Sequence, residues 1–125
     1  MNLQFNGGLL TSSITVLFRG ASLYIEDVII DTGSSHTILT PDVLEKIGVT
    51  YENGDPVYEA YGIGGSAPFY TKIMDAIRIG SYVLINQKVD VGVLPKHHTG
   101  LIGLDILVDN NFVIDFQKLT LKKME

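Results

Sequence analysis

The sequence predicts an all-β domain, a small closed barrel or folded sheet with one or two short helices. Many short apolar runs are separated by turns rich in glycine and polar residues, which is typical of sheet proteins with tight connections. In several of these runs apolar and polar residues alternate, as they do in half-buried strands. The chain of 125 residues contains no repeat of fixed period and no low-complexity tract, so we expect one main domain with its own core.

The overall composition restricts the classes of partner. The formal net charge is −5, which argues against nucleic acid and anionic membrane surfaces as partners. No apolar run reaches the length that a membrane span needs, so no membrane association is expected. Cysteine is absent, which excludes disulfides and thiolate zinc sites and is compatible with the cytoplasmic location that we expect. Residues 1–11 show little pattern and are expected to be a lead-in to a domain over residues 12–125.

The first half of the chain predicts three strands and a short helix. Apolar side chains alternate over residues 14–18, a turn follows at residues 19–22, and a second apolar run ends at residue 30. A short strand is expected at residues 37–39. Thr40 suits a helix N-cap, Pro41 the first helical position and Gly48 the left-handed stop, so a short helix is expected between them.

The second half predicts a series of strands with one unusual loop. Strands are expected at residues 57–61, 69–79, 82–85 and 88–94, with a closing hairpin of residues 112–116 and 119–121. Residues 62–67 join the first two of these strands and are rich in glycine, which predicts a mobile hairpin tip. Residues 100–107 form an apolar run that contains one acid, Asp105.

The most informative stretch is the end of the second strand. The apolar run over residues 28–30 leads directly into Asp31. The next four residues are Thr32, Gly33, Ser34 and Ser35. A carboxylate at the edge of a core is costly unless it has a partner or a function. The surrounding hydroxyls can donate hydrogen bonds, and a glycine permits a sharp turn or a close approach. An Asp-Gly turn with solvated hydroxyls would also fit this stretch alone, so its neighbours in the chain decide the interpretation.

Three separated elements together resemble one family, the retropepsin-like aspartic proteases, which are single-domain homodimeric enzymes. Residues 31–35 resemble the catalytic loop, residues 62–65 are similar to the glycine-rich tip of a flap, and residues 101–105 resemble the apolar element with a glycine that packs behind the catalytic loop. The closing hairpin also recurs in that fold. The helix after Pro41 is more similar to the cellular and bacterial members than to the retroviral ones. The resemblance extends from about Ser12 to Leu121.

The resemblance implies an acid-protease fold and an aspartic endopeptidase activity, a hydrolase reaction that needs no cofactor. Such enzymes hold a water molecule between two carboxylates that share one proton. The chain has one Asp-Thr-Gly and no Asp-Ser-Gly, and Asp75, Asp105 and Asp115 all lack the following glycine. The second carboxylate is therefore expected to be Asp31 of another subunit, in a symmetric homodimer.

The resemblance also implies roles for the residues around the acid. Asp31, Thr32 and Gly33 are the implied catalytic set: Thr32 would lock the two loops across the axis and Gly33 would allow their approach. Ser34 and the flap residues would contact an extended peptide or protein substrate; the flap residues are Gly62, Ile63, Gly64 and Gly65. The Ser34 hydroxyl would also donate to Asp31 and so influence the pH range of activity.

Other titratable residues have simpler interpretations. Asp105 is expected to be a structural acid that bonds the short helix after it. Adjacent histidines on a strand point to opposite faces and no third ligand is evident, so His97 and His98 do not predict a metal site. His36 is expected either to be satisfied by backbone groups or to line the substrate groove. A different class of function also fits, a non-catalytic dimerisation or peptide-binding module, because a fold does not guarantee an activity.

Overall fold

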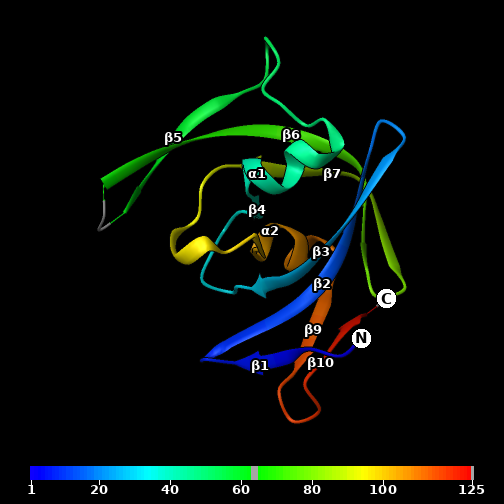
Figure 1. Cartoon of the computed structure of the whole chain (residues 1–125). Helices are drawn as coiled ribbons and strands as arrows, with labels where there is room; N and C mark the ends of the chain where they lie inside the picture. The colour runs from blue at the N-terminus through cyan, green and yellow to red at the C-terminus, as the bar shows by residue number, and fades with distance from the viewer. Residues whose placement is uncertain (63–64, 125) are drawn as a thin grey trace.

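Six strands close into a barrel in the computed structural model, which describes residues 1–62 and 65–124 (Figure 1). The sheet order is β1-β2-β3-β8-β4-β7-β6-β5. A further pairing of β2 with β6 closes the six strands from β2 to β6 in this order into a ring. The strands are β1 (Gln4–Asn6), β2 (Leu9–Phe18), β3 (Ala21–Ile30), β4 (Ile38–Leu39), β5 (Val57–Gly62), β6 (Gly65–Ile79), β7 (Tyr82–Val91), β8 (Gly100–Ile102), β9 (Phe112–Asp115) and β10 (Thr120–Lys123). The predicted all-β fold is confirmed.

The helical segments are short. They are α1 (Pro41–Leu44), the 3-10 turn η1 (Glu45–Ile47), the 3-10 turn η2 (Pro95–His97) and α2 (Leu104–Asp109). The helix expected between Thr40 and Gly48 corresponds to α1 and η1, and Gly48 ends it with φ of 76°. Thr40 has the extended backbone of an N-cap, but its hydroxyl donates to the Thr99 carbonyl at 3.2 Å and not to the helix. No helix within the described residues has the length and apolarity that a bilayer crossing requires.

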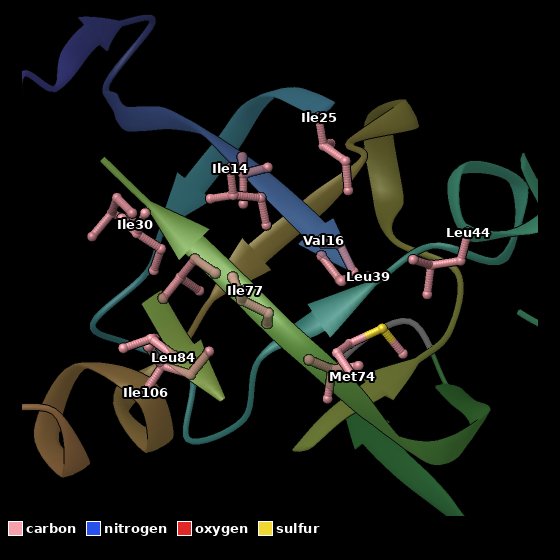
Figure 2. Packing of buried hydrophobic residues seen from close by; sticks show 14 of the residues in the cluster. Ile14, Val16, Ile25, Ile30, Leu39, Leu44, Met74, Ile77, Leu84 and Ile106 are labelled. Carbon is pink, nitrogen blue, oxygen red and sulfur yellow. The ribbon is translucent and has the colours of Figure 1, made fainter. Parts of the chain in front are cut away.

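The apolar core fills the barrel, and side chains of the two short helices pack at its two ends. Side chains on alternate positions of β2 are buried, as the sequence pattern predicts, with Ile14 1% and Val16 0% exposed. Figure 2 shows these side chains beside Ile77 of β6, with Leu44 of α1 at one end of the cluster and Ile106 of α2 at the other. The two short helices therefore close the apolar interior that the strands leave open.

The structure differs from the expected strand limits at the flap and in β7. β6 begins at Gly65, because residues 65–67 pair with β5 in the order Gly62 with Gly65, Tyr61 with Ser66 and Ala60 with Ala67. β7 is one strand where two were expected, and it pairs with β6 from Tyr82 to Val91. In both places the backbone ladder continues through residues whose side chains give no strand signal.

Residues 1–11, expected as a lead-in, carry β1 and the start of β2. Leu3 is 5% exposed, and its N–H donates to the Leu119 carbonyl at 2.8 Å. Asn2 forms a bridge with Thr120 of β10, so the two termini lie side by side (Figure 1). These contacts join the two ends of the chain, and no local pattern in the sequence can signal them.

Candidate active site

Asp31 lies at the end of β3, where a parallel neighbour fixes its backbone. β3 pairs with β8, matching Ile30 with Ile102, and the Asp31 N–H donates to the Ile102 carbonyl at 2.9 Å. The side chain is half-buried, and its Oδ1 accepts a hydrogen bond from the Gly33 N–H at 2.9 Å. The loop therefore turns tightly around its own carboxylate. Thr32 and Gly33 are exposed beside it.

Gly103 packs directly behind this loop. A Cβ at this position would lie 2.5 Å from the His36 carbonyl oxygen and 2.8 Å from that of Ser34. The next residue, Leu104, donates its N–H to the Ser34 carbonyl at 2.8 Å. Because the loop backbone occupies the space of a side chain, the element at residues 101–103 packs behind the Asp31 loop, as expected.

Asp105 is a structural acid, as expected. Its Oδ1 accepts from the Thr37 hydroxyl at 2.7 Å and from the Ile106 N–H at 2.8 Å, and its Oδ2 accepts from the Thr37 N–H at 3.0 Å. Thr37 is fully buried, and its oxygen accepts in turn from the Gly103 N–H at 3.1 Å. The Asp105 carboxylate thus joins the segment after the Asp31 loop to the start of α2.

Asp75 and Asp115, the other two acids compared with Asp31 above, accept hydrogen bonds from backbone N–H groups in turns. Asp115 Oδ1 accepts the N–H groups of Gln117 and Lys118, both at 3.0 Å, within the closing hairpin. Asp75 Oδ2 accepts the N–H of Arg19 at 2.7 Å, in the turn between β2 and β3. Each of these carboxylates therefore stabilises a turn of the fold.

The prediction that the Ser34 hydroxyl donates to Asp31 is wrong. The Ser34 hydroxyl donates to the His36 carbonyl at 2.8 Å. A hydroxyl has one proton to donate, and here the curved loop brings a backbone carbonyl within its reach. The carboxylate of Asp31 receives the Gly33 N–H instead. Ser34 therefore stabilises the loop as a whole.

Two of the predicted flap residues, Gly62 and Gly65, lie on the hairpin of β5 and β6, which projects from the barrel (Figure 1). Gly62 and Gly65 pair at the ends of the two strands. Ile63 and Gly64, the expected tip, lie outside the described residues. Further down the hairpin, the ring of Tyr58 stacks on that of Phe69 with centroids 5.8 Å apart.

Thr32, in the Asp31 loop, lines an apolar groove on the surface. The groove has a volume of about 510 Å³, and its other walls come from α2 and the β9–β10 hairpin. Several of its large apolar side chains are open to solvent, with Phe116 69% and Val108 64% exposed. An apolar surface of this kind typically marks a contact with another molecule.

Asp90 is a residue near the site that the sequence analysis missed. It lies in β7, is 3% exposed, and accepts hydrogen bonds from the hydroxyls of Tyr58 and Thr71. Nδ1 of His36 lies 3.0 Å from its Oδ2, so the ring of His36 faces a carboxylate, whereas backbone partners or a place in the substrate groove were expected. The signal in the sequence was an acid between two valines at residues 89–91, in a strand whose alternate positions are buried.

The histidines at positions 97 and 98 lie in and directly after η2. Among residues 1–62 and 65–124, the structure contains no group of three or more His, Cys, Asp or Glu side chains arranged to hold a metal ion.

Comparisons with known proteins show the family and agree with the fold. The profile of a family described as "Aspartyl protease" matches residues 14–106, a range that includes Asp31, the β5–β6 hairpin and Gly103. The fold matches the crystal structure of a retropepsin-like aspartic protease from Rickettsia conorii with a TM-score of 0.71 and 20% sequence identity, over 96% of this chain and 95% of that one. No curated protein matches the sequence significantly.

Proposed function

The chain belongs to the aspartyl protease family, and on that premise we propose that it is an aspartic endopeptidase that works as a symmetric homodimer. The observation that carries the proposal is the Asp31 loop. The loop is accessible to solvent, and Gly103 packs against its backbone. Its Asp-Thr-Gly sequence occurs once in the chain. One loop supplies one carboxylate, whereas this chemistry uses two.

The proposed mechanism places the Asp31 carboxylates of both subunits on either side of a water molecule. The two acids share one proton, because like charges in contact do not both remain ionised. The unprotonated carboxylate takes a proton from the water as it attacks the peptide carbonyl, and the protonated one donates to the carbonyl oxygen. This reaction uses no metal and no organic cofactor.

The groove beside Thr32 supports the dimer. A two-fold axis that brings two Asp31 loops together also brings the neighbouring apolar surfaces of α2 and the β9–β10 hairpin close to the axis. Burying exposed side chains such as Val108, Val113 and Phe116 would stabilise the pair by the hydrophobic effect. We propose that this surface is the subunit interface and that Thr32 meets its counterpart there.

The proposed substrate is a peptide held in an extended conformation. Strands β5 and β6 project as a hairpin, and an extended chain can pair with strand edges through its backbone. Ser34 and the flap residues Gly62, Ile63, Gly64 and Gly65 are the proposed contacts. Glycines at a hairpin tip would let it bend over the substrate.

The test is Asp31→Asn with a dilution series of the parent protein. In the variant both carboxylates of the dimer are lost at once, so cleavage of peptide libraries should vanish while the melting temperature does not fall, because repulsion between the acids is relieved. Asp42→Asn, which changes an exposed acid in α1, is the matched control and should keep full activity.

The dilution series tests the dimer separately. Activity per subunit should fall at concentrations where sedimentation shows monomer. Turnover by the Asp31→Asn variant, or constant activity of the monomer, would contradict the proposal. If the parent binds peptides or a pepstatin-type inhibitor but cleaves none, the chain is a binding module.

A further inference from the structure

Asp90 occupies a position between the catalytic loop and the flap hairpin. In the sheet, β7 lies between β4 and β6, and Asp90 pairs with Ile38 on one side and Thr71 on the other. β4 follows directly after the catalytic loop, and β6 is the second strand of the flap hairpin. A side chain at this register can therefore contact both elements.

The flap hairpin supplies two donors to the Asp90 carboxylate. The Tyr58 hydroxyl of β5 donates to Oδ2, and the Thr71 hydroxyl of β6 donates to Oδ1 at 3.1 Å. Tyr58 is held against Phe69 by ring stacking. Burial, and then the hydrogen bond to Asp90, raises the pKa of the Tyr58 phenol, which therefore stays a donor at physiological pH.

The catalytic loop reaches the same carboxylate from the other side. Nδ1 of His36 lies 3.0 Å from Oδ2 of Asp90, and the His36 ring centroid is 6.1 Å from that of Tyr58. The His36 carbonyl accepts the Ser34 hydroxyl, and the Asp90 N–H donates to the Thr37 carbonyl at 2.9 Å. Contacts thus run without a break from the Asp31 loop through His36 and Asp90 to Tyr58.

The barrel itself does not require this carboxylate. Backbone pairing already joins β7 to both neighbours at Asp90. A buried charge is costly unless it is paired, and replacing it together with its polar partners by apolar side chains of similar volume is often neutral or stabilising in proteins. What the carboxylate adds is one acceptor, Oδ2, that contacts Tyr58 and His36 together.

We propose that Asp90 is a positioning residue that couples the flap hairpin to the catalytic loop. While the Asp90 carboxylate contacts both Tyr58 and His36, β5 keeps a fixed position relative to the catalytic loop. Release of Tyr58 allows the hairpin to move away from that loop. The effect on catalysis rests on the proposed function, whereas the coupling of the two elements does not.

Tyr58→Phe tests the coupling, because it removes the donor and keeps the ring. In this variant, hydrogen exchange of the backbone amides in β5 should accelerate by roughly tenfold, the effect of losing one hydrogen bond to a charged group. Tyr70→Phe is the matched control: Tyr70 lies on β6 of the same hairpin, pairs with Val57 and packs edge-on against Tyr51. Equal exchange rates in the two variants would overturn the proposal.

A double-mutant cycle with His36→Ala tests whether the two contacts act through one residue. If Asp90 couples them, His36→Ala should accelerate exchange in β5 in the parent but add little in Tyr58→Phe. Effects that multiply fully would show independent contacts and would overturn the coupling.

Turnover provides the third readout. If peptides are cleaved, Tyr58→Phe should lower kcat/KM by roughly tenfold at unchanged dimer affinity, because the flap is no longer held in place. Unchanged kcat/KM would reject a role in catalysis. Absence of cleavage by the parent would refute the proposed function, while the exchange experiments would still decide the coupling.

Discussion

The single proton of the Ser34 hydroxyl goes to the His36 carbonyl, which changes what a substitution there should do. We expect Ser34→Ala to leave the pH–rate profile superimposed on that of the parent. Because one hydrogen bond in the loop is lost, the free energy of unfolding should fall by about 1 kcal/mol. A pH–rate profile together with a denaturant titration checks both effects. A shift of both limbs to higher pH would show that the hydroxyl reaches Asp31 in the dimer.

Gly103 offers a second test at the scale of one residue. In Gly103→Ala the new methyl would collide with the backbone of His36 and Ser34, so the Asp31 loop must move, at a cost of roughly 1–3 kcal/mol. Both kcat/KM and Tm should fall. In Gly100→Ala, at the other end of β8, the methyl first meets the Leu39 side chain at 2.7 Å. This control should lower Tm while kcat/KM of the folded enzyme changes much less; equal losses of kcat/KM would contradict the explanation.

The segment that leads into β5 is held by one buried lysine. Lys72 of β6 is 5% exposed, and its Nζ donates to the Thr50 carbonyl at 3.0 Å, to Glu52 at 2.6 Å and to Asp55 at 2.7 Å. Burial, the largest effect, lowers the pKa of Lys72, but the hydrogen bonds from its ammonium to Asp55 and Glu52 outweigh it and leave the pKa raised. Hydrogen bonds from Lys72 lower the pKa of both carboxyls, and for Glu52 the bond from Arg19 adds to the effect.

These shifts predict how stability depends on pH. Lowered carboxyl pKa values stabilise the fold above the unfolded values of about 4, and this contribution is lost as pH falls through the folded values. The raised pKa of Lys72 keeps its contribution up to strongly alkaline pH. We expect Lys72→Met to lower Tm at pH 7 and the difference from the parent to shrink toward pH 3. Lys88→Met, an exposed lysine on β7, is the control and should show little difference at either pH. Thermal melts at both pH values check this; a constant difference would contradict it.

At the scale of the whole molecule, the surface around Phe116 should determine assembly. Phe116→Glu places a charge in the groove beside Thr32, so the dimer dissociation constant should rise by at least about tenfold, because burying the charge costs free energy. Ile85→Glu adds the same charge to a side chain that is 71% exposed on β7 and is the control. Sedimentation of both variants gives the dissociation constants. Equal constants would place the interface elsewhere.

Several features of the fold and the family could be predicted from the amino-acid sequence. Alternation over residues 14–18 predicted the second half of β2, and the order of Thr40, Pro41 and Gly48 predicted the helical segment. These two signals are local because side-chain period and capping act over a few residues. Three separated stretches, residues 31–35, 62–65 and 101–105, together predicted the family, which the comparison over residues 14–106 shows.

Contacts between groups far apart in the sequence could not be predicted in the same way and are known from the folded chain. The proton of Ser34 goes to His36, Leu3 packs beside the closing hairpin, and Asp90 joins the loop after Asp31 to a hairpin that begins 26 residues later, at Val57. These contacts depend on the order of strands in the barrel, where β7 lies between β4 and β6. An acid in an apolar strand shows in the sequence that a partner is needed; which residues become its partners depends on the folding of the whole chain.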